Sequence, residues 1–245
     1  MDLLIITKRA VRLLILTVLV LLFLPAALRL TRDRVMPAFS GKDVIASQTI
    51  VIDAGHGGED GGAVASDGTV ESGINLEIAK RLELVFAFLG HNTSMTRRED
   101  VSIHSDDAET IRQKKVSDLK NRVQLVNGTP DPVLISIHQN SLPTVPSVHG
   151  AQVFFGKVEP GGEIAASIQN ALNLSVNQGA EKKPKAIDPG IYLMKNVQCP
   201  AVLVECGFLS NAEETKKLNT SSYQTRLAIA VAAGFLAADQ EPNAR

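Results

Sequence analysis

Four residues have the types that metal-assisted hydrolysis requires. His56, Glu71 and His138 offer two imidazoles and one carboxylate, the usual ligands of a catalytic zinc ion that keeps a fourth position open for water. Singly each is weak evidence, because a lone histidine is more often a core or surface residue and a glutamate also favours a helix N-terminus. Glu205 closes an aliphatic run, where a carboxylate is costly unless paired or functional, so it suits a general base. His149 is an alternative ligand.

The glycine-rich segment around His56 also invites a nucleotide-binding interpretation. No phosphate-loop motif occurs there, and Asp60 stands where the dinucleotide-binding pattern needs its third glycine. The carboxylates of Glu59 and Asp60 would also repel phosphate. A histidine and several carboxylates at a flexible turn therefore favour a cation.

Three short aliphatic runs position these side chains. Residues 50–52, 133–137 and 201–204 each read as a buried strand that ends in a polar, chemically competent residue. Such strands predict a mostly parallel or mixed sheet with its site at the carboxyl edge. Further strands are expected at Gly150–Phe155 and Ile191–Met194, and helices at 74–89, 161–176 and 223–238. The alternation predicts a single α/β layered domain flanked by helices.

Two other segments carry local predictions. Ser210, followed by Glu213, has the form of a capping box and should open another helix. The charged segment 101–127 reads as a loop leading into a surface helix, whose Arg122 and Lys114-Lys115 pair we expect on a solvated face. Arg97 is expected to anchor a turn.

The N-terminal region differs from the rest of the chain. Residues 1–36 hold six Lys or Arg and two Asp around the uncharged, aliphatic stretch Leu13–Leu28. This pattern predicts export and contact with a membrane, either as an uncleaved signal-anchor or as a cleaved secretory signal. Residues 37–48 read as a polar tether, which leaves 49–240 as the catalytic domain. We expect the protein on the outer side of the membrane, either anchored or secreted.

Overall charge and cysteine content exclude other classes. The chain of 245 residues has 25 Lys plus Arg against 26 Asp plus Glu, so no basic field recruits nucleic acid. Its two cysteines, Cys199 and Cys206, flank one predicted strand. An extended run would hold them on the order of 20 Å apart, beyond disulfide reach.

Six ordered strings carry a family resemblance. They resemble the zinc-dependent N-acetylmuramoyl-L-alanine amidases: IVIDAGHGGEDGGAV (50–64), ESGINLEIAKRL (71–82), TRRED (96–100), SIHQNS (136–141), GAQVFF (150–155) and PAVLVECGFLSNAEE (200–214). The resemblance implies that His56, Glu71 and His138 bind Zn²⁺ and that Glu205 is the catalytic base. It also implies cleavage of the amide between N-acetylmuramic acid and L-alanine of the peptidoglycan stem peptide, with the metal polarising the carbonyl and activating water.

A narrower resemblance concerns the subtype. IRQKKVSDLKNRV (111–123) and GIYLMKN (190–196) look like the germination-specific amidases of the spore cortex, and the forespore intermembrane space would be the corresponding location. That subtype implies work alongside a muramic acid deacetylase, which allows the muramic lactam to form, and leaves an activating protein open as a partner. Two alternatives stay open: a non-catalytic peptidoglycan-binding module and a zinc peptidase acting on stem peptides.

Overall fold

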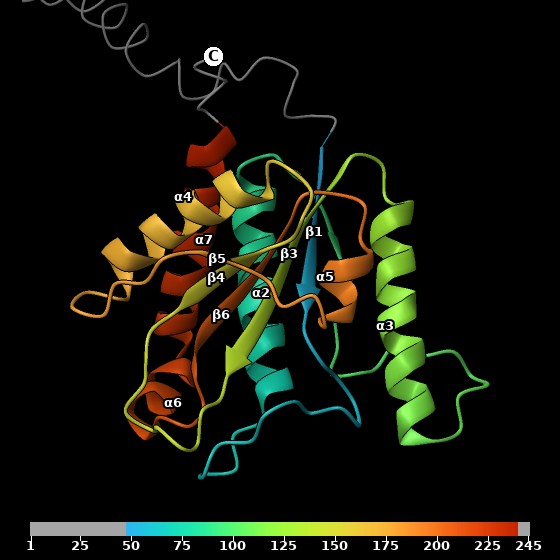
Figure 1. Ribbon diagram of the computed structural model, residues 1–245, viewed down its shortest axis with the longest axis horizontal. Helices are drawn as coiled ribbons and strands as arrows, with labels where there is room; N and C mark the ends of the chain where they lie inside the picture. Colours follow the sequence, from blue (N-terminus) through green and yellow to red (C-terminus); the bar gives the residue numbers. More distant parts are fainter. Residues whose placement is uncertain (1–47, 240–245) are drawn as a thin grey trace, which may run out of the picture. The chain divides into compact units, whose positions relative to one another are not determined.

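The computed structural model describes residues 48–239, which form a six-stranded mixed sheet (Figure 1). The strand order is β2-β1-β3-β6-β4-β5. The four strands β2, β1, β3 and β6 are mutually parallel, whereas β4 runs antiparallel to β6 and β5 runs parallel to β4. The strands are β1 (Thr49–Ala54), β2 (Asn92–Met95), β3 (Pro132–Asn140), β4 (Gln152–Phe155), β5 (Lys185–Ala186) and β6 (Ala201–Phe208).

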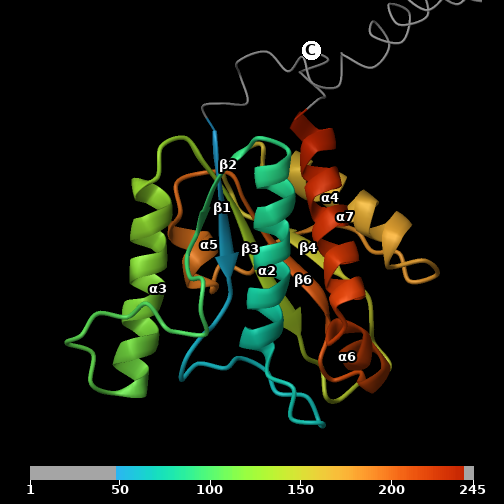
Figure 2. The ribbon, with the colours of Figure 1, turned by 180° about the vertical axis from the view of Figure 1, so that it is seen from behind.

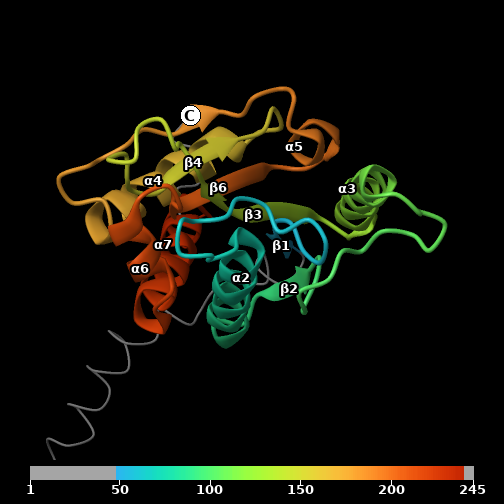
Figure 3. The ribbon, with the colours of Figure 1, turned by 90° about the horizontal axis from the view of Figure 1, so that it is seen from below.

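Helices cover both faces of this sheet. Figure 3 shows α2 (Glu71–Phe88), α4 (Gly161–Ser175) and α7 (Ser221–Asp239) on one face, and α3 (Ile111–Gly128) and α5 (Tyr192–Asn196) on the other. The short α6 (Ala212–Leu218) packs against β6 and α7. The predicted α/β layered domain with a mixed sheet is confirmed.

Side-chain alternation along the strands divides the core in two. In β1, Ile50 and Ile52 join the larger apolar cluster beneath α2, α4 and α7, whereas Val51 joins a smaller one beneath α3 and α5. Towards the carboxyl edge the second face turns polar, because Asp53 and Ser136 follow Val51 and Leu134 at the same parity. A polar site is thus prepared on the α3 side of the sheet.

The two ends of the described chain lie away from that carboxyl edge. Figures 1 and 2 show the start of β1 and the end of α7 at one end of the domain, and the loop that follows β1 at the opposite end. The predicted export segment 1–36 and nearly all of the tether 37–48 lie outside the described residues. Within residues 48–239, no helix is long and apolar enough to cross a membrane.

One predicted strand was wrong. Residues 191–194 were expected to form a strand, but Tyr192–Asn196 forms α5, and consecutive Leu193 and Met194 both enter the smaller core. Periodicity cannot separate a short apolar helix from a strand, and here a turn in which Asp188 accepts from the backbone of Gly190 and Ile191 starts the helix.

The helix predicted to begin after residue 210 is confirmed as α6, but its cap lies one residue later than expected. Asn211 rather than Ser210 is the N-cap, and its side chain accepts from the backbone N–H groups of Glu213 and Glu214. Asparagine and serine are comparable caps, so the sequence alone favours neither. The edge strands β2 and β5 were not predicted.

Candidate metal centre

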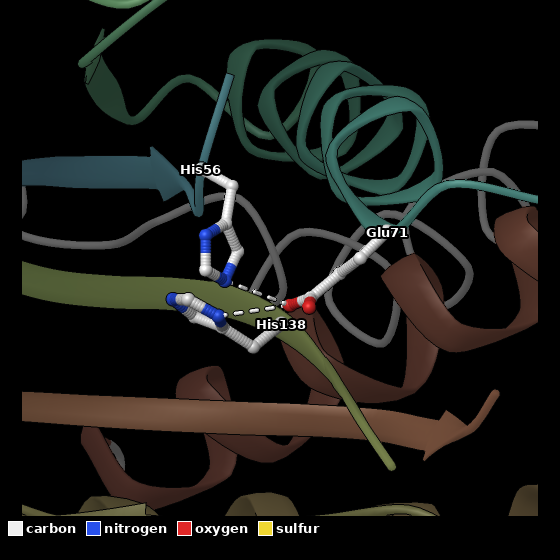
Figure 4. Close-up of side chains that lie close together, drawn as sticks. All are labelled: His56, Glu71 and His138. Carbon is white, nitrogen blue, oxygen red and sulfur yellow. Dashed lines mark hydrogen bonds and ion pairs between the residues drawn. The ribbon is translucent and has the colours of Figure 1, made fainter. Parts of the chain in front are cut away.

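Three side chains converge at the carboxyl edge of the sheet. Figure 4 shows His56 from the loop after β1, Glu71 from the start of α2, and His138 from β3 pointing toward one another. Glu71 Oε1 lies 3.0 Å from His138 Nδ1 and 3.4 Å from His56 Nε2. One potential ligand atom from each residue lies within 4.8 Å of the other two. Two imidazoles and a carboxylate at this spacing fit a zinc ion.

Glycines permit this close approach. A Cβ on Gly55 would lie 2.3 Å from the His138 ring, and a Cβ on Gly62 would lie 2.5 Å from Glu71 Oε2. Gly62 also has a φ of +73°, in the left-handed region. His56 itself adopts a φ of +61°, uncommon for a residue with a side chain. The loop therefore holds its histidine in a conformation that the chain alone does not favour.

The beginning of α2 is fastened to the same loop. The backbone N–H groups of Glu71 and Ser72 donate to the carbonyls of Ala63 and Gly61, which satisfies two groups that a helix start leaves unpaired. The Glu71 carboxylate in turn accepts from the N–H groups of Ala63 and Gln139 at 2.8 and 3.0 Å. Burial would raise the pKa of Glu71, but its contacts with His138 and His56 outweigh that effect and hold it well below the usual range.

Glu205 lies beside this cluster. In the parallel register of β3 and β6, Glu205 is the partner of His138, on the same face of the sheet. Its Oε2 is buried and has no hydrogen-bond partner among the described residues. Burial raises the pKa of Glu205 to about 7, with His138 opposing the shift and the Glu71 carboxylate adding to it. An unpartnered buried carboxylate oxygen is expensive, so it fits a group whose partner is a substrate or water.

A cavity connects the four residues. Its volume is about 410 Å³, and it extends from the cluster of His56, Glu71 and His138 along the sheet between α3 and α5. The cluster and Glu205 make one end polar, whereas Leu119, Leu193 and Leu203 make part of the wall apolar. Such a site combines a few convergent polar groups with an apolar wall, as ligand sites commonly do.

Arg122 was expected on a solvated face, and this prediction was wrong. Its side chain is 2% exposed and bonds Asp53 through Nη1 and Asp118 through Nε, each at 2.6 Å. Its Nη2 donates to the His56 carbonyl at 2.7 Å. Asp53 also accepts from Ser136, and its pKa falls from 3.8 to about 2, because the Arg122 charge and these hydrogen bonds outweigh burial.

Arg97 does more than anchor a turn. It is buried, and its guanidinium donates to the carbonyls of Ala54, Gly55 and Ser72, on both sides of the β1–α2 loop. Nothing in its spacing distinguishes it from Arg98, which pairs with Glu83 at the surface. Sequence reasoning therefore missed both buried arginines as supports of the site.

The other candidate residues lie elsewhere. His149 is exposed and contacts the Ser147 carbonyl, so it does not join the cluster. Lys114 and Lys115 pair with Glu59 and Asp60. Cys199 and Cys206 are free thiols in the two different apolar clusters, on opposite faces of the sheet, as expected for residues that are not bridged.

Comparison with known sequences decides the family. Residues 50–237 match the N-acetylmuramoyl-L-alanine amidase family, which is more than half of the chain. The chain belongs to this family. The germination-specific N-acetylmuramoyl-L-alanine amidase of Bacillus subtilis is 34% identical over 192 residues, covering 78% of this chain and 80% of that protein. The N-acetylmuramoyl-L-alanine amidase AmiC of Escherichia coli is 27% identical and covers 77% of this chain.

Solved amidase structures share the fold. The CwlD amidase of Clostridioides difficile, solved in complex with the GerS lipoprotein, superposes with a TM-score of 0.76 at 36% identity, covering 79% of this chain and 99% of that one. A second N-acetylmuramoyl-L-alanine amidase, from Clostridium difficile 630, gives a TM-score of 0.68 at 27% identity, with coverages of 80% and 99%. The amidase fold therefore accounts for the whole described domain.

Proposed function

We propose that the chain is a zinc hydrolase of peptidoglycan that cleaves the amide between the lactyl group of N-acetylmuramic acid and L-alanine of the stem peptide. His56, Glu71 and His138 hold the metal, and Glu205 is the general base. One observation carries the proposal. The three potential ligand residues line the same cavity as Glu205, whose Oε2 has no hydrogen-bond partner among the described residues.

The chemistry divides between the metal and the protein. When bound, zinc supplies Lewis-acid polarisation of a carbonyl and lowers the pKa of water. Glu205 Oε2 takes a proton from the attacking water and delivers it to the nitrogen of the leaving amine. Burial raises the pKa of Glu205 in the metal-free site, which favours the protonated carboxyl that holds the proton between the two transfers. Leu119, Leu193 and Leu203 place apolar surface beside these polar groups in the cavity wall.

The setting of the reaction follows from the relatives and the N-terminal pattern. Similarity to a germination-specific amidase supports a role in germination. Our proposal adds the spore cortex as the substrate and a muramic acid deacetylase as the partner that enables muramic-lactam formation. The basic and aliphatic residues 1–36 support export, with membrane attachment if the segment stays uncleaved and secretion if it is cleaved. The relative solved with a lipoprotein makes an accessory protein part of the proposal.

The test is product analysis on isolated peptidoglycan. The full chain, loaded with zinc, is incubated with cortex and with vegetative peptidoglycan, and the products are read by mass spectrometry. An amidase releases stem peptides that begin with L-alanine and leaves peptide-free muramic acid. Shortened peptides still joined to muramic acid would instead indicate a peptidase, and zinc-loaded protein that binds the wall without turnover would indicate a binding module.

Substitution of Glu205 isolates the proposed base. We expect Glu205→Gln to lower kcat by about 10²–10⁴-fold, the range for a positioned acid–base group, while zinc content stays at one ion per chain. Glu213→Gln is the matched control, because Glu213 is exposed and pairs only with Lys216. Unchanged turnover in Glu205→Gln would remove Glu205 from the chemistry.

A further inference from the structure

A carboxylate outside the proposed ligand set touches one of its histidines. Asp60 Oδ2 lies 3.0 Å from His56 Nδ1, while His56 Nε2 faces Glu71. An ionised carboxylate only accepts hydrogen bonds, so the proton of this contact sits on Nδ1. The lone pair of the neutral ring is then at Nε2, directed to the place where the three ligand atoms meet.

The loop is folded so that Asp60 can reach back to the histidine. The N–H of Gly57 donates to the Asp60 carbonyl at 2.8 Å, and the N–H of Asp60 donates to the Gly57 carbonyl at 3.3 Å. Gly57 has a φ of +139°, which a residue with a side chain rarely adopts. The tight turn therefore brings the Asp60 carboxylate back onto the ring of His56.

Helix α3 holds Asp60 from the other side. Lys115 Nζ lies 3.1 Å from Asp60 Oδ2 and 3.3 Å from Oδ1, and the neighbouring Lys114 pairs with Glu59. Two turns later on the same helix, Arg122 donates to the His56 carbonyl. Contacts from α3 therefore reach His56 at its backbone directly and at its ring through Asp60.

Few residues of α3 are fully buried against the rest of the domain. Of its eighteen residues only Asp118, Arg122 and Val126 are buried, and two of these are charged. Polar contacts with the β1–α2 loop therefore contribute to the position of the helix, beside its contacts with Asp53 and with residues 102–105. If Asp60 links the packing of α3 to metal binding at His56, the two processes are coupled. Each then shifts the other by the same free energy, because such coupling is reciprocal.

We propose that Asp60 is a positioning residue that fixes the ring of His56 for metal binding, and that Lys115 links this residue to the seating of α3. The inference rests on the proposed ligand set and adds Asp60, which is not a ligand, as a residue that supports His56. In this role Asp60 acts on the metal site through His56.

The test is zinc affinity of the full chain, measured by competition with a chromogenic chelator. We expect Asp60→Ala to weaken binding about 10- to 100-fold, as loss of a ligand's hydrogen-bond partner does. Asp60→Asn should lose less, because its amide oxygen can still accept from Nδ1. Lys115→Met should weaken binding several-fold. Two controls should change nothing: Asp67→Asn in the same loop, whose side chain contacts Thr69 N, and Lys120→Met, exposed on the same helix.

A second readout separates positioning from general damage. Zinc should slow hydrogen exchange of the α3 amides in the unaltered chain and in Asp67→Asn, but not in Asp60→Ala. Zinc affinity and α3 protection in Asp60→Ala equal to those of the unaltered chain would overturn the proposal, as would equal losses in Asp60→Asn and Asp60→Ala.

Failure of the proposed ligand set gives a different pattern. If His56→Ala binds zinc as tightly as the unaltered chain, the ligand assignment fails. If His56→Ala loses zinc while Asp60→Ala retains it fully, only the positioning role fails.

Discussion

Gly55 sets the distance between the β1–α2 loop and the side chain of His138 on β3. A methyl group at this position would overlap the His138 ring, which has no room to retreat from the sheet without losing its place beside Glu71. The residue has no chemistry of its own. Its importance lies in the space it leaves.

Replacement of Gly55 tests this point. We expect Gly55→Ala to displace His138 and to weaken zinc binding at least 10-fold, measured by chelator competition. Gly73→Ala is the control, because nothing lies within 4 Å of a Cβ there and alanine suits the first turn of α2. Full zinc affinity in Gly55→Ala would mean that the loop can shift without cost.

Residue types and strand ends were enough to propose the four central side chains. His56, His138 and Glu205 follow or close aliphatic strands, so their convergence could be expected from parallel topology. The supporting arginines could not be found this way. Whether Arg122 faces solvent or a buried carboxylate depends on which helix packs over the end of β1. The sequence pattern does not predict that contact.

At the scale of elements, α3 shows how a polar helix can be fixed to a sheet. Its Arg122 side chain is surrounded by Asp53, Asp118 and backbone carbonyls. Each nitrogen of the guanidinium group donates a hydrogen bond to one of these acceptors. A buried ion pair of this kind contributes little when compared with apolar packing, but breaking one side is costly.

The expected cost can be measured by unfolding. Arg122→Met should lower the free energy of unfolding by about 3–5 kcal/mol, because it leaves the Asp53 carboxylate in the interior without its counter-charge. The control is Arg112→Met, on the exposed face of the same helix, which should change it by less than about 0.5 kcal/mol. Urea titration followed by circular dichroism gives both values. Equal stabilities would show that α3 is held by other contacts.

The same pair predicts a dependence on pH. The folded-state pKa of Asp53, about 2, is below its ordinary value of 3.8, so its contribution is complete above pH 4 and is lost as the pH falls toward 2. The shift corresponds to about 2 kcal/mol. The stability difference between the unaltered chain and Asp53→Asn should therefore shrink by that amount from pH 5 to pH 2. A difference independent of pH would contradict the ion pair.

The element assignments that failed were short ones. Periodicity identified α2, α4 and α7 because each repeats its apolar spacing over several turns. It could not identify α5, where Leu193 and Met194 give two apolar positions and no repeat. The edge strand β2 carries the polar Asn92, Thr93 and Ser94, so its strand character comes from pairing with β1.

At the scale of the whole molecule, topology gathers the chemistry at one edge. Four neighbouring strands are parallel, so residues distant in sequence, such as His56 and Glu205, share one end of the domain. The aliphatic runs predicted this gathering, but not that β4 reverses direction beyond β6. Nothing in the strand sequences indicates direction, since an antiparallel edge can be equally apolar.

The placement of Cys199 and Cys206 has a consequence for redox chemistry. The sheet separates the two thiols, so no bridge can form between them without unfolding, and burial raises the pKa of Cys199 to about 11, which keeps it protonated. The domain should melt at the same temperature with and without dithiothreitol, measured by differential scanning calorimetry. A melting temperature that falls on reduction would contradict this. If the melting temperature is the same under both conditions, the domain matures identically in an oxidising and in a reducing compartment. It then needs no thiol oxidoreductase to reach its native state.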